Sequence, residues 1–380
     1  MSKTKKLNVG VIFGGRSGEH EVSIVSAESI IKALNPENYE VIPIGITKNG
    51  QWFAGSKAIE YLKEGVKKLP FKSLLLPDPE ERGLISLNPD SGSLAENEAV
   101  KKLDIVFPVI HGTFGEDGCL QGLLELANLP YVGCGVLGSA LGLDKIIQKD
   151  LFVSATLPAV EYIWFLAHDW DKNQAEIIKL IEAKLAYPLF SKPANAGSSL
   201  GINKCRNLSE LITGINEAKA YDRKVIIEQG LEDIREIEVA VLGNDSPRAS
   251  VCGEIVASNE FYDYDAKYID GQSEAFIPAD LPESVAKQIR EYAILAFKTL
   301  DLSGMARVDF LVKKENNQIY LNEVNTIPGF TSVSMYPKLW QATGLAYPDL
   351  LDELINLALA RHEQKNRLLT SYRPKKDWYK

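Results

Sequence analysis

ARVDFLVKKENNQIYLNEVNTIPG, the stretch from Ala306 to Gly329, is the strongest indication of the fold of this 380-residue chain. Its polar centre, KKENNQ, separates two segments in which apolar and polar residues alternate, which predicts a β-hairpin. Because side chains alternate faces along a strand, the polar residues of each segment share one face. The expected register forms three pairs: Arg307 with Asn325, Asp309 with Glu323, and Leu311 with Leu321.

This register sets two carboxylates opposite each other, which needs a compensating interaction. Two carboxylates about 5 Å apart repel by roughly 3 kcal/mol at an effective dielectric constant near 20. Two carboxylates and an amide oxygen are hard ligands that suit Mg²⁺. The alternative is a solvated polar face beside a Lys or Arg. Because Leu311, Ile319 and Leu321 are expected on the same face, we favour the metal site.

Length, charge and cysteine usage limit the class of protein. A chain of this length predicts two or three domains. The net charge of -9 argues against a nucleic-acid partner, although residues 365–380 form a basic tail. No apolar run is long enough for a membrane span, and the N-terminus lacks a signal peptide. The cysteines lack metal-ligand spacing, which fits reduced thiols in a cytoplasmic protein: Cys119, Cys134, Cys205 and Cys252.

The remaining pattern predicts an α/β domain followed by α+β domains. An N-terminal, doubly wound domain with a parallel sheet is expected over 1–137, with an insertion of hairpins at about 49–102. A central domain is expected over 138–242 and a C-terminal domain over 243–364. The elements expected in the first domain are strands at 7–13, 39–46, 104–110 and 129–132 and helices at 22–34 and 118–127. Those expected in the central domain are helices at 144–155, 174–185 and 208–220 and strands that end at Lys192, Lys204, Glu228 and Leu242.

Small-residue loops and lysines indicate a phosphate ligand. The loop ANAGSSLG follows a strand that ends at Lys192, and its amides can approach an anion closely, although small residues also form ordinary turns. It is not a P-loop, because the lysine precedes the glycines. The loop GGRSGEHEVS is not G-x-G-x-x-G, so a nicotinamide site is not favoured. With Lys145 at a helix start and a downstream Mg²⁺ site, a nucleoside triphosphate is the expected ligand.

Two further segments are open to two interpretations each. Glu228 and Glu236, at a strand end and at the next strand, could accept hydrogen bonds from adenine and ribose, or could be solvated. The loop NEFYDYDAKYIDGQ at 259–272 holds three tyrosines and ends near a glycine. Such a loop is a candidate lid, whereas the alternative is a surface hairpin that packs its rings on a neighbouring domain.

Taken together, these motifs resemble the D-alanine:D-alanine ligase family of the ATP-grasp superfamily. HGTFGEDGCLQG at 111–122 looks like the N-terminal signature of that family, and GMARVDFLV with LNEVNTIPG looks like its C-terminal signature. GEHEVS, LDK, KPANAGSSLG and FYDYDAKY occur in the order typical of the family. The resemblance spans Val9 to about Leu359 and implies the ATP-grasp fold.

The resemblance also implies roles for individual residues. Around the first D-alanine, the resemblance implies that Glu19 binds the ammonium group and that Ser198 and Tyr268 are hydrogen-bonded around the carboxylate of Glu19. His111 and Glu116 are implied to lie nearby. For the second D-alanine, the resemblance implies that Ser334 and Met335 bind the carboxylate. Arg307 and the backbone amide of Gly329 are implied to stabilise the oxyanion that forms during the reaction. Those implied for ATP are Lys145, Lys192 and Lys267 on phosphates, Glu228 and Leu231 on adenine, and Glu236 on ribose. Those implied for two Mg²⁺ ions, which Mn²⁺ could replace, are Asp309, Glu323 and Asn325.

The implied activity is the ATP-dependent joining of two D-alanines through an acyl phosphate, with release of ADP and phosphate, for peptidoglycan synthesis. Similar enzymes are homodimers. Some members of the family use D-lactate or D-serine as second substrate. A nucleotide sensor is a different class of function, and it would lack the metal and oxyanion residues. A third alternative is an ATP-grasp ligase that acts on other substrates. The motifs that contain Glu19 and His111 argue against it.

Overall fold

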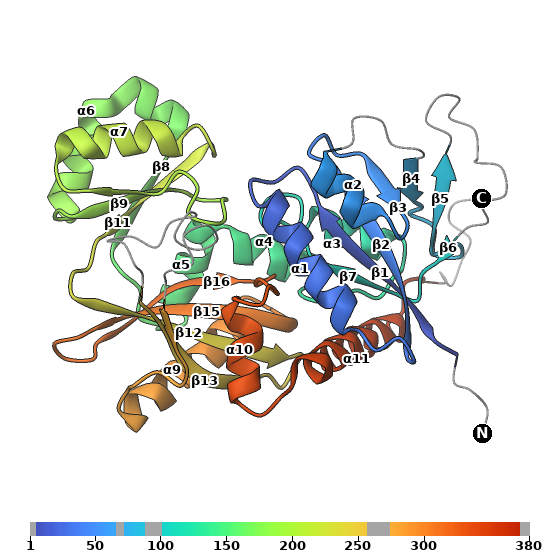
Figure 1. Cartoon of the computed structure of the whole chain (residues 1–380). Coiled ribbons are helices and arrows are strands. Elements are labelled where there is room, and N and C mark those ends of the chain that lie inside the picture. The colour runs from blue at the N-terminus through green and yellow to red at the C-terminus, as the bar shows by residue number, and fades with distance from the viewer. Residues whose placement is uncertain (1–4, 66–71, 88–100, 257–273, 373–380) are drawn as a thin grey trace.

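A computed structural model describes residues 5–65, 72–87, 101–256 and 274–372. The chain forms an N-terminal α/β unit and two further sheets, one of four strands and one of five (Figure 1). This mixture of parallel and antiparallel sheets confirms the predicted α/β and α+β class. The expected lid at 259–272, with Lys267 and Tyr268, lies outside the described residues.

The N-terminal unit is built on a sheet with the order β3-β2-β1-β7, in which β1, β2 and β7 are parallel. Its strands are β1 (Leu7–Gly14), β2 (Tyr39–Ile46), β3 (Trp52–Ala54) and β7 (Ile105–Pro108), and its helices are α1 (His20–Ala33) and α3 (Cys119–Leu126). The strand expected at 129–132 is reduced to a single bridge between Val106 and Tyr131, so that prediction was wrong in extent.

The predicted insertion contains hairpins, as expected, and a helix that was not predicted. Its elements are α2 (Ala58–Glu64), β4 (Lys72–Leu75), β5 (Gly83–Leu87) and β6 (Lys101–Lys102), and the three strands form a small antiparallel sheet. The first strand after residue 49, β3, pairs with β2 instead and extends the main sheet.

The central four-stranded sheet carries helices on one face and α5 near the other. Its elements are β8 (Tyr162–Leu166), α6 (Ala167–Lys184), β9 (Leu189–Pro193), β10 (Asn203–Cys205), α7 (Leu208–Ala218) and β11 (Lys224–Gln229). α6 and α7 cover one face and share a core with Val225 and Ile227 (Figure 1). Ile226 points the other way and packs on Ile146 of α5 (Lys145–Ser154). Strand alternation therefore turns Glu228 toward α5 as well.

The five-stranded sheet has the order β14-β13-β12-β15-β16 and separates two cores. Its elements are β12 (Ile234–Gly243), β13 (Arg248–Val256), β14 (Glu274–Phe276), α9 (Glu283–Thr299), β15 (Gly304–Lys313), β16 (Ile319–Asn325) and α10 (Met335–Ala342). Val239 and Val241 pack with α9, whereas Ala240 and Leu242 pack with α10. The domain boundary predicted at residue 242 falls at the end of β12, whereas the change of sheet comes between β11 and β12.

The register of β15 and β16 agrees with the prediction at its polar end and differs at its apolar end. Arg307 pairs with Asn325 and Asp309 with Glu323, but Phe310, not Leu311, lies opposite Leu321. A β-bulge between Asp309 and Phe310 causes the shift, since an extra residue on one strand moves all later pairs. The prediction that Ile319 and Leu321 lie on the face of Asp309 was wrong. The core residues on the opposite face are Phe310, Val312, Ile319 and Leu321.

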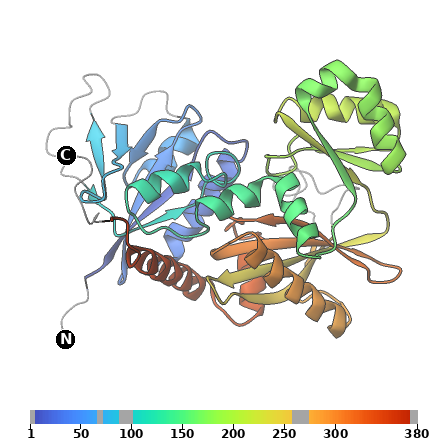
Figure 2. The same cartoon turned by 180° about the vertical axis from the view of Figure 1, so that it is seen from behind.

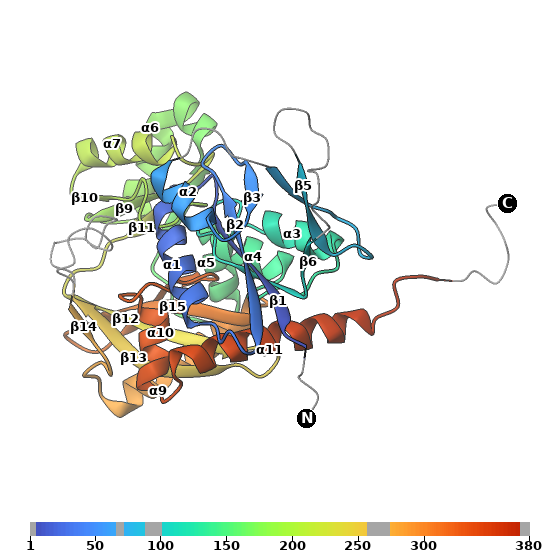
Figure 3. The ribbon, with the colours of Figure 1, turned by 45° about the vertical axis from the view of Figure 1, so that its right-hand side comes forward.

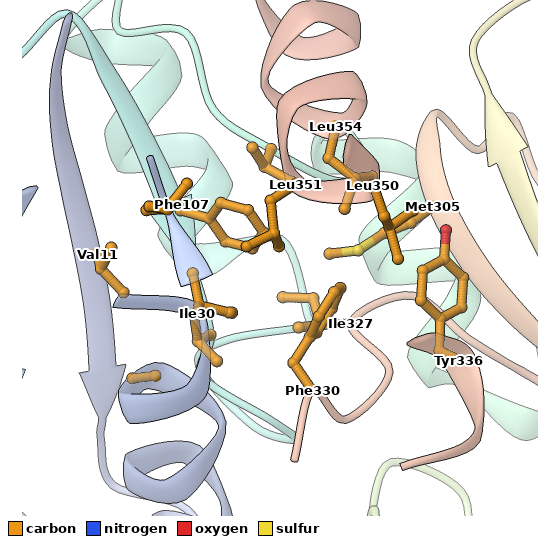
Figure 4. Packing of buried hydrophobic residues seen from close by; sticks show 14 of the residues in the cluster. Val11, Ile30, Phe107, Met305, Ile327, Phe330, Tyr336, Leu350, Leu351 and Leu354 are labelled. Carbon is orange, nitrogen blue, oxygen red and sulfur yellow. The ribbon is translucent and has the colours of Figure 1, made fainter. Parts of the chain in front are cut away.

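One hydrophobic core joins the N-terminal unit to the five-stranded sheet. Figure 4 shows Val11 and Phe107 on one side of this core and Phe330 and Tyr336 on the other, with Leu351 of α11 above them. α11 (Tyr347–Asn366) contacts α1, β7 and β15, and it passes beneath both units (Figure 3). The loops that follow β1 and β7 are therefore held over the β15–β16 hairpin. In the part of the chain that the structure describes, no helix is both long and apolar enough for a membrane span.

Candidate active site

Two adjoining cavities lie where the three sheets approach one another. One has a volume of about 250 Å³ and is bordered by the N-terminal loops, and the other, of about 590 Å³, lies between the central and five-stranded sheets. The residues that line both are Ser199, Ile202, Glu238, Arg307 and Glu323. The two cavities are therefore neighbouring compartments of one cleft, with Arg307 at their junction.

The polar face of β15 forms a tight charged cluster at that junction. Arg307 donates from Nε to Asp309 Oδ1 at 2.7 Å and from Nη2 to Asp309 Oδ2 at 2.6 Å. Glu238 of β12 approaches the guanidinium at 3.1 Å. Burial acts to lower the pKa of Arg307, but Asp309 and Glu238 outweigh it and raise that pKa well above the ordinary value. The guanidinium is therefore charged and fixed in orientation.

The donor set on this face fits a divalent metal ion. Asp309 and Glu323 are paired residues of neighbouring strands, and the Asn325 amide lies 2.9 Å from Asp309 Oδ2. The set is two carboxylates and one amide, and among the described residues no group of three or more His, Cys, Asp or Glu that could hold a metal is found. That composition suits Mg²⁺, which keeps several waters and few protein ligands. Lys145 Nζ lies 3.4 Å from Glu323 Oε2 and offsets part of the negative charge.

Glu19 is a buried acid that lines the smaller cavity. It precedes α1, where the helix dipole favours a negative charge, and its side chain accepts a hydrogen bond from Ser198 Oγ. Ser198 comes from the loop after β9, 179 residues away along the chain. Gly197 and Gly112 lie against the carboxylate, and a Cβ atom at Gly197 would overlap Glu19 Oε2. The structure thus brings Glu19 and Ser198 together, as the resemblance implies.

His111 and Glu116 connect the loop after β7 to the segment after β16. His111 Nδ1 lies 2.9 Å from the carbonyl oxygen of Ile327, and burial lowers the pKa of the imidazole. Glu116 accepts hydrogen bonds from the amides of Gly112 at 2.8 Å and Ile327 at 2.6 Å. Burial raises the pKa of Glu116 to about 7, and Glu19 adds to that effect. Both side chains line the smaller cavity.

The larger cavity is lined by four of the residues that the sequence analysis assigned to a nucleotide, whereas Lys145, also expected on a phosphate, lines the smaller cavity. Lys192, Glu228, Leu231 and Glu236 all line it. Lys192 Nζ donates to Glu228 Oε2 at 2.6 Å, so the expected phosphate ligand and the expected adenine ligand form an ion pair. Burial acts to raise the pKa of Glu228, but Lys149 and Lys192 outweigh it and lower that pKa to about 2.

The segment after β16 completes the smaller cavity. Gly329, Ser334 and Met335 all line it, and Ser334 is the N-cap residue of α10. Ser334 Oγ accepts a hydrogen bond from the amide of Thr331 at 3.0 Å. A Cβ atom at Gly329 would lie 2.6 Å from Ser334 Oγ, so a larger residue at this position would require Ser334 to shift.

Two buried charges at the site were not predicted from the sequence. Lys149 lies 3.1 Å from Glu228 Oε1, and Glu238 lies beside Arg307. Lys149 follows Lys145 by four residues, so the two lysines share one face of α5, and that spacing could have pointed to it. Glu238 follows Glu236 by two residues on β12, so both side chains point to the same face of the strand. This spacing is a weaker indication of a functional site, because exposed strands show the same pattern.

Comparison with known proteins identifies close relatives over nearly the whole chain. Family models described as D-ala D-ala ligase N-terminus and D-ala D-ala ligase C-terminus match residues 8–134 and 151–356. The D-alanine–D-alanine ligase of Natranaerobius thermophilus is 49% identical over 369 residues, which cover 97% of this chain and 99% of the relative. The D-alanine–D-alanine ligase of Heliobacterium modesticaldum is 48% identical over 370 residues, which cover 97% of this chain and 99% of the relative.

Two solved structures are similar in fold as well as in sequence. The D-alanine–D-alanine ligase from Coxiella burnetii superposes with a TM-score of 0.80 at 36% identity, covering 96% of this chain and 97% of that one. The VanG D-Ala:D-Ser ligase from Enterococcus faecalis superposes with a TM-score of 0.81 at 36% identity, covering 93% of this chain and 100% of that one.

Proposed function

The chain belongs to the D-alanine–D-alanine ligase family and joins two D-alanine molecules with the use of ATP, and from that premise we propose which residues carry each step. The observation that supports the proposal best is the shared cleft. Arg307 lines both compartments, one with Glu19 and the other with Glu228, so a nucleotide and an amino acid could meet beside it.

The first step activates the first D-alanine, whose carboxylate is a poor electrophile. An oxygen of that carboxylate attacks the γ-phosphorus, the bond from phosphorus to the bridging oxygen breaks, and ADP leaves. Lys145 and Lys192 spread the negative charge of the phosphates. Two Mg²⁺ ions, which Mn²⁺ can replace, would be held by Asp309, Glu323 and Asn325 and would supply further charge neutralisation.

The second step forms the peptide bond. The unprotonated amine of the second D-alanine attacks the acyl carbon, and the carbon–oxygen bond to phosphate then breaks while the nitrogen gives its proton to the departing phosphate. Arg307 and the Gly329 amide stabilise the oxyanion of the tetrahedral intermediate. Ser334 and Met335 bind the carboxylate of the second D-alanine, since the N-terminus of α10 offers amide hydrogens to an anion.

The remaining contacts orient the substrates. Glu19, fixed by Ser198 and Tyr268, binds the ammonium group of the first D-alanine, and His111 and Glu116 hold the surrounding loop. The residues proposed for the nucleoside are Glu228 and Leu231 for adenine and Glu236 for ribose. Lys267 and Tyr268 belong to a lid that excludes water, because acyl phosphates hydrolyse. We further propose a cytoplasmic homodimer that supplies dipeptide for peptidoglycan.

Release of phosphate by the purified protein with ATP and Mg²⁺ tests the proposal. D-Alanine should support release together with formation of the dipeptide, whereas L-alanine should support neither. D-Serine and D-lactate should compete poorly with D-alanine as second substrate. D-Lactate needs no deprotonated amine, so its share of product should be largest at low pH. A product that contains mainly D-serine or D-lactate at neutral pH would contradict the assignment of D-alanine as second substrate.

A further inference from the structure

Lys149 is a fully enclosed lysine on α5, which lies between the central and five-stranded sheets (Figures 1 and 2). Its side chain is 1% exposed and lines neither of the two cavities. Nζ lies 3.1 Å from Glu228 Oε1 and donates to the carbonyl oxygen of Asn322 at 3.2 Å. Lys149 therefore stands behind the cavity wall, where it approaches Glu228 directly.

Glu228 thus has two lysine partners that differ in access to the cleft. Lys192 Nζ donates to Oε2, lines the larger cavity and keeps 11% of its side chain exposed. Lys149 approaches Oε1 from the enclosed side. The carboxylate of Glu228 is only 4% exposed, so it needs a cation to remain ionised. Because two lysines contact Glu228, one of them can move to another anion while the other keeps Glu228 ionised.

We propose that Lys149 is a positioning residue that keeps Glu228 ionised and in place while Lys192 turns from Glu228 to the phosphates of the nucleotide. This inference rests on the proposed function, because it requires Lys192 to bind phosphate. Without Lys149, the departure of Lys192 would leave a buried carboxylate with no cation. Such a group takes up a proton rather than remain charged.

The other charged and titratable groups around Glu228 strengthen this expectation. Besides Lys149 on α5 and Lys192 on β9, the groups that interact with this cluster are Tyr162 on β8, Glu236 on β12 and Glu323 on β16. Burial acts to raise the pKa of Glu228, and it is the two lysines that lower it. Negative charge at Glu236 and Glu323 would favour the protonated form of Glu228 once both lysines were lost.

Two variants that each remove one lysine from Glu228, Lys149→Met and Lys192→Met, test the proposal as a matched pair. Calorimetric titration with Mg²⁺ and a non-hydrolysable ATP analogue, in buffers of different ionisation enthalpy, counts the protons bound with the nucleotide. When the nucleotide binds, Lys149→Met should take up as much as about one proton more than the wild type. The ratio of its Kd for the analogue to that of the wild type should therefore rise by up to about tenfold for each unit by which the pH is raised. Lys192→Met should bind more weakly at every pH without additional proton uptake.

A Lys149→Met protein with the proton count of the wild type and a Kd ratio independent of pH would overturn the proposal. If Lys149→Met fails to fold, Lys149→Gln, which keeps a polar group beside Glu228, takes its place and the same two measurements decide: extra proton uptake supports the role of Lys149, and the wild-type proton count overturns it. The double variant Lys149→Met/Glu228→Gln should lose the extra proton, which assigns it to Glu228. Failure of the wild type to bind the analogue would instead refute the proposed nucleotide site.

Discussion

Arg307 and Asp309, two residues apart on β15, form a two-pronged ion pair in which Nε donates to Oδ1 at 2.7 Å and Nη2 to Oδ2 at 2.6 Å. Both side chains point to the same face of the strand because they are separated by one residue. Asp309 is also the proposed metal ligand opposite Glu323. One carboxylate therefore orients the cation proposed for the oxyanion and contributes to the proposed metal site.

Replacing this guanidinium should affect chemistry more than binding. Arg307→Lys keeps a positive charge but loses the planar fork, so we expect kcat to fall by about 10²- to 10³-fold with a smaller change in KM for ATP. Steady-state phosphate release measures both. Arg235→Lys is the matched control, because Arg235 makes the same two-pronged pair with Glu254 and lines neither cavity. Equal loss of kcat in the two variants would contradict a role specific to Arg307.

The close approach of Gly197 to Glu19 predicts a specific defect in D-alanine binding. Gly197→Ala would place a Cβ atom on Glu19 Oε2, so either this carboxylate or the loop that carries Ser198 must shift, which disturbs the hydrogen bond between Glu19 and Ser198. A charged hydrogen bond contributes about 1.5–3 kcal/mol, so KM for the first D-alanine should rise by about 10- to 100-fold. KM for ATP should change little. Gly122→Ala on α3 has open space around its Cβ and should leave both constants unchanged.

Glu116 predicts a pH dependence of stability. Because burial raises its pKa from 4.5 to about 7, the folded protein keeps the proton over a range in which the unfolded chain has lost it. The free energy of unfolding should therefore fall as pH rises through this range, by about 3 kcal/mol in total. Glu116→Gln does not titrate, so this part of the fall should be absent. Thermal unfolding of both proteins between pH 5 and pH 8 measures the difference, and parallel curves would contradict it.

Local periodicity predicted many of the elements, because most strands and helices show a pattern of burial, but it missed α2 and placed the start of α6 at residue 174 instead of Ala167. β1, β2 and α1 lie within two residues of their predicted ends, and the polar half of the hairpin has the predicted register. The bulge after Asp309 was not predicted, since the alternation of apolar residues continues through it. The face assigned to Leu321 was wrong for that reason.

Contacts between distant segments were beyond the sequence pattern. The core in which Phe107 meets Phe330 joins residues more than two hundred positions apart. The burial of Lys149 depends on the packing of α5 against both sheets, and a lysine on a helix is usually solvated. The family resemblance supplied most of the candidate site, and the structure shows which of those residues contact each other.

The assignment of a metal ion to the paired residues of β15 and β16 underlies the proposed mechanism, and the Mg²⁺ dependence of phosphate release in Glu323→Gln is its sharpest test. We predict that the Mg²⁺ concentration for half-maximal activity rises by at least about tenfold, with partial recovery at high Mg²⁺. Glu274→Gln, an acid that lines the same cavity, should retain the wild-type requirement. An unchanged Mg²⁺ requirement in Glu323→Gln would contradict the metal site.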